Sequence, residues 1–369
     1  MFLHGHFRKD VNHTLDRAKK LLEAMHVGAG DAVLLHKPSN MFYISGYTGE
    51  GLVLLSARMK AIVTDFRYTE QAGQQAPGYQ VCMTTRDCDH NQTAFRLMRE
   101  QNIQRVYYED DHITVRDYRD LEKAMEGMEF CPVNKAPEKL REIKDETEIE
   151  KMAKACKITS EAFEYILGVI REGMTEREIA RALENYMVSH GAQEIAFHTI
   201  VASGENGSLP HAIPGERRVC RGDMITLDFG AKVDGYCADM TRTVALGEPG
   251  EKMRHVYDVV LAAQQMAQDA LKAGKVCRDV DAVARDYIAA QGFAENFGHG
   301  LGHSLGIDIH ESPRLSMLCT DVTQENHVLT VEPGVYLPGI GGVRIENSCV
   351  VTKDGCYSLT TAPKELIIL

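Results

Sequence analysis

Two aspartates, Asp228 and Asp239, flank a predicted tight turn in the stretch M-I-T-L-D-F-G-A-K-V-D-G-Y-C-A-D-M-T-R-T, residues 224–243. The Asp-Gly pair at 234–235 predicts a two-residue hairpin turn, whose central positions both need positive φ. In that register Asp228 lies opposite Thr241, and Asp239 is a diagonal neighbour on the same sheet face. Two such carboxylates repel each other unless a cation lies between them. Solvated aspartates on an exposed hairpin are the alternative, and further ligands decide between the two interpretations.

An internal repeat supplies more candidate ligands. Gly173 and Gly274 each precede a predicted helical segment that ends at a glycine, Gly191 or Gly292, which gives an offset of 101 residues. Further matches at this offset are Met152 with Met253, Ala162 with Ala263, Ile179 with Val280, Tyr186 with Tyr287, and Glu194 with Glu295. Thr175 and Glu178 form a capping box at the start of the first helix. The order of these identities indicates two αβ halves related by a pseudo-two-fold axis.

The repeat continues downstream with small changes in offset, and acidic residues of one copy match acidic residues of the other. T-L-D-F-G at 226–230 matches T-V-E-P-G at 330–334 at an offset of 104, so Asp228 corresponds to Glu332. The second copy then runs into G-V-R-I-E-N, which puts Glu346 in the place of Asp239. The sequence therefore predicts four carboxylates that converge near the axis.

Histidines accumulate between the two predicted hairpins. The segment F-G-H-G-L-G-H-S-L-G-I-D-I-H-E, residues 297–311, carries His299, His303 and His310, and its glycines leave room for close backbone approach. His211-Ala-Ile-Pro214 also matches His310-Glu-Ser-Pro313 at an offset of 99. Three histidines in one short segment, beside four converging acids, favour a metal or catalytic site over isolated structural histidines.

The donor set indicates a particular chemistry. Four carboxylates and an imidazole suit Mn²⁺ or a similar divalent ion better than a thiolate zinc site does. Four negative ligands balance two divalent cations, and two ions about 3.5 Å apart polarise a carbonyl and activate a water, as in metal-assisted hydrolysis. The sequence has neither H-E-x-x-H nor a Ser/His/Asp signature, which excludes the zincin and serine-hydrolase alternatives.

The elements that must hold these residues divide into two domains. A smaller α/β domain over 1–135 is expected to have helices over 10–25 and 91–101, and strands over 32–35, 51–55, 61–64 and 105–108. A charged helical run over 140–170 then opens a second domain, 136–369, which contains the repeat. The predicted fold class is α+β.

Composition limits the alternatives. The 369 residues are 44% apolar and carry a formal net charge of −12, so nucleic acid is not an expected partner. No stretch resembles a signal peptide or a membrane span, and we expect a cytoplasmic protein without a membrane partner. Ten cysteines occur without any C-x-x-C and are interpreted as reduced thiols. Cys237, close to Asp239, is interpreted as a buried thiol.

Together these motifs carry a family resemblance. L-D-F-G, C-A-D-M-T-R-T, G-L-G-H-S-L-G-I-D-I-H-E, V-E-P-G-V-Y and G-V-R-I-E-N resemble the proline-peptidase branch of the pita-bread metallopeptidases, which contains aminopeptidase P and prolidase. N-M-F-Y-I-S-G-Y and T-D-F-R-Y-T-E-Q-A resemble the creatinase-type N-terminal domain of the same proteins. Methionine aminopeptidases share the pita-bread part but usually lack that domain.

The resemblance implies roles for individual residues. The dinuclear metal ligands would be Asp228, Asp239, His303, Glu332 and Glu346, with Asp239 and Glu346 bridging the two ions. Glu332 would also help to take the proton of the attacking water. His211, His299 and His310 would contact substrate or stabilise the tetrahedral intermediate. Arg344 would lie near a bridging ligand and also bind substrate. Mn²⁺ is the expected metal, with Co²⁺ or Zn²⁺ as alternatives.

The implied activity is hydrolysis of the bond between an N-terminal residue and proline. The motif T-D-F-R-Y-T-E-Q-A favours an Xaa-Pro aminopeptidase over an Xaa-Pro dipeptidase, and proline-containing peptides are the expected partners, bound by a homodimer. A non-catalytic pita-bread binding module is the alternative from another class. The chain has no Trp, and Asn347 follows Glu346 where an acidic residue is common in the family.

Overall fold

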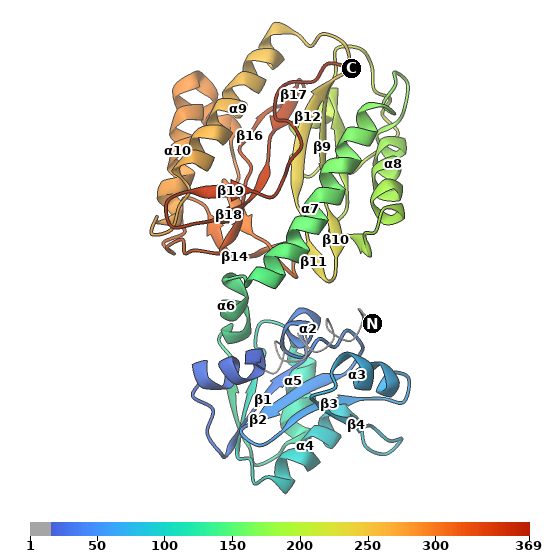
Figure 1. Cartoon of the computed structure of the whole chain (residues 1–369), viewed down its shortest axis with the longest axis vertical. Helices are drawn as coiled ribbons and strands as arrows, with labels where there is room; N and C mark the ends of the chain where they lie inside the picture. Colours follow the sequence, from blue (N-terminus) through green and yellow to red (C-terminus); the bar gives the residue numbers. More distant parts are fainter. Residues whose placement is uncertain (1–15) are drawn as a thin grey trace, which may run out of the picture. The chain divides into compact units, whose positions relative to one another are not determined.

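The computed structural model describes residues 16–369, and its chain divides into an N-terminal unit that ends at Arg141 and a C-terminal unit, Glu142–Leu369 (Figure 1). The expected boundary, between 135 and 136, lies at the start of helix α6 (Ala136–Glu142), whereas the structural division lies at its end. Part of the helix expected over 10–25 lies outside the described residues, and residues 16–24 are helical.

The N-terminal unit is built on one mixed sheet. Its six strands have the order β4 (Gln80–Met83), β3 (Lys60–Thr64), β2 (Leu52–Ser56), β1 (Asp31–Leu35), β5 (Arg105–Tyr108) and β6 (Glu129–Pro132). β1 and β2 are apolar and almost wholly buried, as strands covered on both faces must be. Four of the predicted elements, 32–35, 51–55, 61–64 and 105–108, are therefore strands of this sheet.

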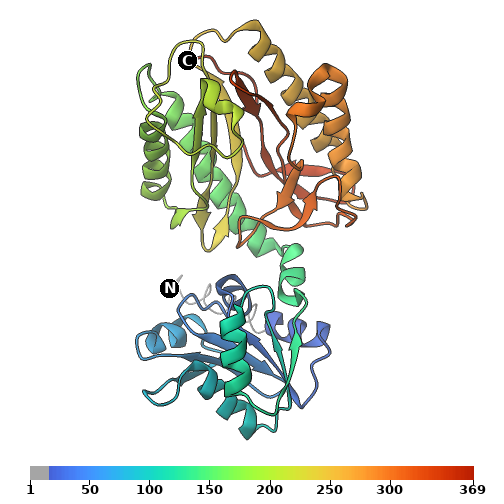
Figure 2. The ribbon, with the colours of Figure 1, turned by 180° about the vertical axis from the view of Figure 1, so that it is seen from behind.

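Short helices surround the sheet of the N-terminal unit. They are α2 (Pro38–Ser45), α3 (Thr69–Gln75), α4 (His90–Glu100), α5 (Val115–Ala124) and α6. α4 and α5 each begin with a capping box, which fixes their first residues, and α4 is the helix predicted over 91–101. α5 lies in front of the sheet in Figure 2 and behind it in Figure 1, so it covers one face.

The predicted helical run over 140–170 is two helices and not one. α6 ends at Glu142, and α7 (Glu146–Leu167) begins after Asp145, whose side chain accepts a hydrogen bond from the Glu148 backbone N–H in a capping box. Charged helix-forming residues on both sides hide the interruption in the sequence, while D-x-x-E marks the new start. Ile143 and Lys144 are consequently outside any helix.

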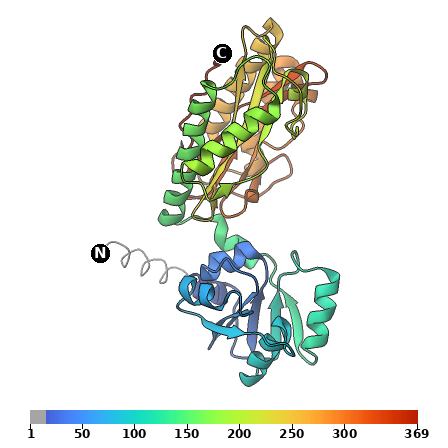
Figure 3. The same ribbon diagram turned by 90° about the vertical axis from the view of Figure 1, so that its right-hand side faces the viewer.

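The C-terminal unit has two similar halves, each with a pair of helices against twisted strands (Figures 1 and 3). The first half contains α7, α8 (Glu176–Ser189), β7 (Glu194–Ile195), β8 (Ile200–Ser203), the short 3₁₀ helix η1 (Gly204–Ser208), β9 (Met224–Phe229), β10 (Ala231–Val233), β11 (Tyr236–Cys237) and β12 (Met240–Ala245). Each half has its own hydrophobic core between its helices and strands. No helix among the described residues has the length and apolar content of a membrane span.

The second half repeats this order. It contains α9 (Glu251–Ala270), α10 (Cys277–Ile288), the short helices η2 (Ala289–Phe293) and η3 (Ala294–Asn296), β13 (Gly302–Ser304), β14 (Glu311–Leu315), β15 (Val328–Val331), β16 (Gly334–Leu337), β17 (Gly341–Arg344), β18 (Asn347–Val351) and β19 (Cys356–Ser358). The sheet order β8-β9-β12 of the first half reappears as β13-β15-β18. The duplication predicted from the sequence is thus visible in the topology.

Hydrogen bonds and backbone angles also repeat. The N–H of Gly173 donates to the carbonyl of Val219, and the N–H of Gly274 donates to the carbonyl of Thr323, at 2.9 and 2.8 Å. Both glycines have positive φ, of 86° and 83°, which an L side chain adopts only with strain. The offset between the two copies is 101 at the donor glycines and 104 at the acceptor residues Val219 and Thr323. The match of His211 with His310, which needs an offset of 99, falls outside this progression.

The predicted hairpin is present. Asp234 and Gly235 have φ of 50° and 81°, and Asp228 lies opposite Thr241 in the ladder of β9 and β12. The strands approach closely at Gly230, where a Cβ atom would lie 1.8 Å from the carbonyl oxygen of Ala238. Glycine is therefore required at the point where the hairpin leaves β9.

Candidate metal centre

Three of the four predicted carboxylates lie where a ladder of strands is interrupted. Asp239 follows β11 and precedes β12, Glu332 follows β15, and Glu346 lies between β17 and β18. Asp228 is inside β9. The interruptions free these residues from regular pleating, so their side chains can turn toward one space between the halves.

The two halves meet directly at these residues. The N–H of Glu346 donates to the carbonyl of Thr241 at 3.0 Å, and the Thr241 hydroxyl donates to Glu346 Oε2 at 2.7 Å. Ser348 Oγ in β18 donates to the carbonyl of Asp239 at 2.8 Å. Hydrogen bonds across the seam therefore fix the carboxylates of one half relative to those of the other.

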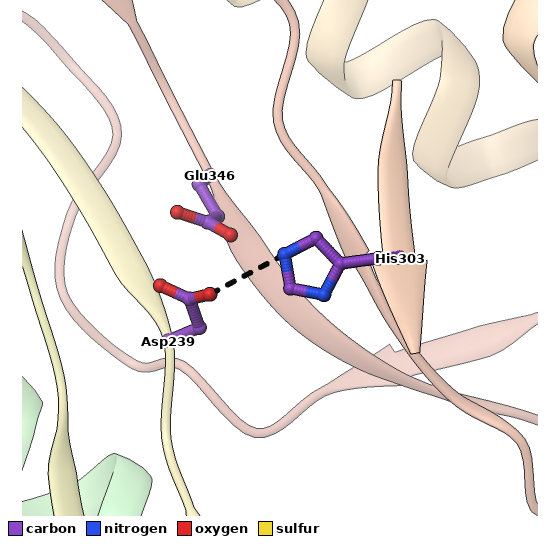
Figure 4. A group of neighbouring side chains, drawn as sticks. All are labelled: Asp239, His303 and Glu346. Atoms are coloured by element: carbon purple, nitrogen blue, oxygen red, sulfur yellow. Dashed lines mark ion pairs between the residues drawn. The ribbon is translucent and has the colours of Figure 1, made fainter. Parts of the chain in front are cut away.

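Asp239, His303 and Glu346 form a compact buried cluster (Figure 4). Each offers one ligand atom, and these atoms lie within 4.8 Å of one another. His303 Nε2 is 3.6 Å from Asp239 Oδ2 and 3.4 Å from Glu332 Oε1. Figure 4 shows both carboxylates and the imidazole pointing into the same space.

Asp228 and Glu332 border the cavity that contains this cluster. Glu332 Oε1 accepts a hydrogen bond from Thr330 Oγ1 at 3.0 Å. Asp228 Oδ2 accepts one from Arg344 Nη2 at 2.6 Å, while Asp228 Oδ1 and Glu346 Oε1 are buried without a hydrogen-bond partner among the described residues. All five predicted ligands thus face one cavity, of about 280 Å³.

Burial and mutual repulsion disfavour the ionised forms of these carboxyl groups when no cation is bound. Burial raises the pKa of Asp239 well above its usual range, and the nearby charges of Glu346, Asp228 and Glu332 raise it further. Burial likewise raises the pKa of Glu346 and brings that of Glu332 to about 7. A cation between the carboxylates would reverse these shifts, because it stabilises the charged forms.

The tautomer of His303 fits a metal ligand. Its Nδ1 is 3.0 Å from the carbonyl of Ser304, so we assign the ring proton to Nδ1 and a lone pair to Nε2. Burial lowers the His303 pKa to about 3, which keeps the imidazole neutral. The Nε2 lone pair then faces carboxylate oxygens of Asp239 and Glu332, which also present lone pairs. The donor set and its two unpartnered carboxylate oxygens fit divalent cations.

Arg344 links the cluster to the second half's strands. Its guanidinium donates to Asp228 Oδ2, to Thr241 Oγ1 at 3.1 Å and to the Tyr336 hydroxyl at 2.8 Å. The Thr241 hydroxyl in turn donates to Glu346. One buried cation therefore orients a carboxylate on each side of the seam.

His299 lines the cavity, but both of its ring nitrogens are already used. Nδ1 is 2.8 Å from the carbonyl of Gly300, and Nε2 is 2.9 Å from the Tyr336 hydroxyl. Burial lowers the His299 pKa to about 4. The resemblance implied that His299 contacts substrate. His299 thus contacts Tyr336, which accepts a hydrogen bond from Arg344, and a contact of His299 with substrate stays a prediction.

His310 and His211 lie at the edge of the cavity with more freedom. The His310 ring packs against His303, with centroids 4.5 Å apart at 70°. Neither His310 nor His211 makes a side-chain hydrogen bond with any described residue, and both line the cavity. Burial and Arg314 lower the His310 pKa. Both imidazoles are therefore placed to meet a ligand.

The structure changes one detail of the predicted symmetry, the position of Glu346 in the ladder. In the second half Glu332 is level with Glu346. This follows from the ladder pairs on either side, Val331 with Asn347 and Gly334 with Arg344. In the first half Asp228 is level with Thr241, two residues beyond Asp239. Glu346 therefore does not occupy the place of Asp239 in the ladder, although both acids reach the same cluster.

Two residues that complete the cavity, Tyr336 and Arg314, were not predicted from the sequence. Tyr336 follows Glu332 in the motif V-E-P-G-V-Y, and this place beside a predicted ligand was the usable signal. Arg314 lies opposite His303 in the ladder of β13 and β14 and lines the cavity, which no local pattern indicates. Cys237 is buried, and its raised pKa, about 12, results mainly from burial. It is the buried thiol that was predicted.

Comparison with known proteins agrees with this geometry. Residues 150–353 match Metallopeptidase family M24, and residues 17–143 match the Creatinase/Prolidase N-terminal domain. The structure is similar to that of an Xaa-Pro dipeptidase from Bacillus anthracis, at 41% identity and a TM-score of 0.93, covering 96% of this chain and 100% of that one.

Two other relatives are similar over nearly their whole length. The structure of an X-Pro aminopeptidase from Thermotoga maritima shares 37% identity at a TM-score of 0.89, covering 96% of this chain and 100% of that one. An Xaa-Pro dipeptidase of Pyrococcus horikoshii is 36% identical, over 95% of this chain and 99% of the relative. The predicted fold, a creatinase-type domain followed by a duplicated pita-bread domain, is confirmed. The chain belongs to metallopeptidase family M24 and carries its pita-bread domain behind a Creatinase/Prolidase N-terminal domain.

Proposed function

We propose that this protein hydrolyses the peptide bond between an N-terminal residue and proline, with two divalent metal ions held by Asp228, Asp239, His303, Glu332 and Glu346. The observation that carries the proposal is the convergence of four buried or half-buried carboxylates and a neutral imidazole on one cavity. The names of the relatives, Xaa-Pro dipeptidase and X-Pro aminopeptidase, support proline as the residue after the scissile bond.

Divalent ions in such a donor set polarise a peptide carbonyl and make a water more acidic. The protein's own groups supply the rest. Glu332 has one oxygen, Oε1, oriented by the Thr330 hydroxyl, and its carboxylate is the proposed acceptor of the water's proton. His310 and His211 are the proposed donors to the oxyanion or the leaving group, because neither ring is committed to a described residue.

Arg344 and Tyr336 are assigned a positioning role. Their hydrogen bonds hold Asp228 and reach His299, and neither side chain needs to contact the substrate for this. The proline ring removes an amide N–H and fixes φ, so a dedicated cavity suits this bond. Apolar walls at Phe197, Ile200 and Pro210 fit such a substrate.

Within this activity we propose dipeptides as the preferred substrates, in place of the aminopeptidase preference expected from the first domain. Arg314 is exposed, lines the cavity and lies across from His303. Its guanidinium makes no hydrogen bond or ion pair with any described residue. A cation at this position would bind the free carboxylate of a C-terminal proline. Two of the three relatives described above are named Xaa-Pro dipeptidase.

The test uses metal-depleted protein reloaded with Mn²⁺ and three substrates, Ala-Pro, Ala-Pro-Ala and Ala-Ala. The proposal predicts release of proline from Ala-Pro, slower cleavage of Ala-Pro-Ala and little cleavage of Ala-Ala. Faster cleavage of Ala-Pro-Ala would make the protein an aminopeptidase. Absence of cleavage of both proline substrates, with metal bound, would reject the proposed function and favour a non-catalytic binding role.

A further inference from the structure

Lys144 is a buried lysine at the break between α6 and α7. Its side chain is 1% exposed, and its ammonium donates to Ser304 Oγ at 2.9 Å, to Glu311 Oε2 at 3.2 Å and to the carbonyl of Glu142 at 3.3 Å. Its backbone N–H donates to the carbonyl of Asn326 at 3.0 Å. All three ammonium protons therefore have acceptors, two of them more than 150 residues away in the sequence.

These two acceptors form the base of one hairpin. Ser304 at the end of β13 pairs with Glu311 at the start of β14, next to a bulge between His303 and Ser304. The other oxygen of Glu311, Oε1, accepts the Asp308 N–H at 3.1 Å. A Cβ atom on Gly306 would lie 2.9 Å from both Glu311 oxygens, so glycine leaves the space that this carboxylate occupies.

The loop above this base carries His310. Its first part is held from outside the hairpin, because the Cys237 N–H donates to the Gly306 carbonyl at 2.7 Å and the Leu305 N–H donates to the Val328 carbonyl at 3.3 Å. The described structure gives Ile309 and His310 no such backbone hydrogen bond. The anchor that follows His310 directly is Glu311, and Lys144 fixes the Glu311 carboxylate.

A buried ion pair contributes less to stability than its short distances suggest. Desolvation opposes it, and apolar side chains of similar volume often stabilise a core as well or better. What the pair supplies is direction, since two hydrogen bonds of the Lys144 ammonium, to Ser304 and Glu311, tie the segment before α7 to both strands of the hairpin. The same hairpin contributes His303 to the cluster and His310 to its edge.

We propose that Lys144 and Glu311 are positioning residues that hold His310 against His303 for the reaction. The inference rests on the proposed function, because it assigns His310 a part in the hydrolysis of the Xaa-Pro bond. Neither side chain lines the cavity. Their effect on the reaction is transmitted by the loop over residues 305–310.

A double-mutant cycle tests this transmission. Lys144→Met removes the ammonium at similar length, and the account predicts that kcat for Ala-Pro falls roughly ten- to hundredfold while KM changes little. In a protein that already carries His310→Ala, Lys144→Met should change kcat less than about twofold, because effects through one residue are not additive. An equal fold-loss in both backgrounds would overturn the inference.

Hydrogen exchange of metal-free protein tests the pair without any activity. Lys144→Met and Glu311→Gln should each speed exchange of the amides over 305–311, with little change over 224–229 in β9. The matched control is Lys364→Met, since Lys364 is half-buried and bonds the side-chain oxygens of Gln264 and Gln265. It should leave exchange over 305–311 unchanged.

The two failures are distinguishable. If wild-type protein releases no proline, the proposed function fails, and the exchange measurement still decides whether the pair holds the loop. If proline is released but exchange over 305–311 is the same in wild type, Lys144→Met and Glu311→Gln, the positioning role is wrong.

Discussion

Arg344 donates a 2.6 Å hydrogen bond to Asp228 Oδ2, and both side chains are buried at the seam between the two halves of the C-terminal unit. The bond commits one oxygen of Asp228 to the guanidinium and leaves Oδ1 without a described partner. Asp228 therefore presents a single oriented lone-pair donor to the cavity. No arginine donates a hydrogen bond to the neighbouring carboxylates of Asp239, Glu332 and Glu346 among the described residues. Burial together with repulsion raises the pKa values of these three acids, although the charge of Arg344 opposes the rise.

Replacing Arg344 with Met should cost kcat/KM for Ala-Pro roughly a hundredfold. Removing one partner of a buried pair leaves an uncompensated charge, worth about 3–5 kcal/mol, and frees Asp228 and Tyr336 to reorient. Steady-state kinetics and the bound-metal content measure the effect. Arg254→Met, which removes an exposed pair with Glu248, is the control and should stay within about twofold. Activity of Arg344→Met close to wild type would contradict the positioning role.

Neutralising Asp239 or Glu346, two of the proposed metal ligands, should raise the thermal stability of the metal-free protein and abolish its stabilisation by metal. In Asp239→Asn and Glu346→Gln the repulsion among buried acids is smaller, so the metal-free Tm should exceed that of wild type. For wild type, Mn²⁺ at about a hundred times its Kd should add about 2.7 kcal/mol and, for a chain of 369 residues, raise Tm by roughly 3–4 °C.

Differential scanning calorimetry with and without Mn²⁺ gives both quantities for these carboxylate variants. Asn347→Asp is a useful contrast, because it adds charge next to Glu346 without removing a candidate ligand. Its side chain would face the Arg242 guanidinium, which donates to Asn347 Oδ1, so this variant should keep the metal-induced rise in Tm. A metal-induced rise that survives unchanged in Asp239→Asn would show that the ions bind elsewhere.

Arg314→Met should remove the preference for a free C-terminal carboxylate. Wild type should cleave Ala-Pro faster than Ala-Pro-amide, which has the same shape without the charge, by roughly tenfold or more. Arg314→Met should cleave Ala-Pro and Ala-Pro-amide at similar kcat/KM. Only the kcat/KM for Ala-Pro should fall relative to wild type. Equal ratios of acid to amide in wild type and Arg314→Met would show that another group binds the carboxylate.

His327 should make stability depend on pH in mildly acidic solution. Its Nδ1 accepts the Gln324 N–H at 3.2 Å, and burial, followed by the nearby charge of Lys144, lowers its pKa from 6.5 to about 4. The unfolded chain binds more protons than the folded one between these values, so this contribution is complete above pH 6.5 and is lost as pH falls toward 4. The loss amounts to roughly 3 kcal/mol.

His327→Asn offers an acceptor for the same N–H without titrating in this range. Compared with wild type, metal-free variant protein should lose less stability between pH 7 and pH 4, as measured by the shift in Tm. The difference between the proteins isolates His327, because all other titrating groups are shared. Parallel Tm curves over this range would contradict the assignment.

Local sequence patterns predicted the hairpin turn and the repeat, and from these the positions of the candidate ligands. The residue types Asp234 and Gly235 alone predicted the turn, because both positions need positive φ. The turn in turn fixed the register of the ladder, in which Asp228 lies opposite Thr241. The repeat predicted that Glu332 would join the first-half acids, because duplicated halves must meet along their seam. The five candidate ligands accordingly face one cavity.

Other features depend on contacts between distant segments, which a sequence pattern does not contain. Lys144 was hidden inside an apparent helix, and only the capping box at Asp145 marked the break. The hydrogen bonds of His299 with Tyr336 and Gly300 were likewise not indicated by any pattern, and its contact with substrate stays a prediction. Arg314 became a candidate only when the ladder placed it across from His303.

The proposed metal centre is tested by titrating metal-depleted protein with Mn²⁺ while bound metal and proline release from Ala-Pro are recorded on the same samples. We expect no proline release without metal, a rise in release that is complete at two ions per chain, and loss of this rise in Asp239→Asn. Proline release by protein with no bound metal, or no release with both ions bound, would contradict the proposal.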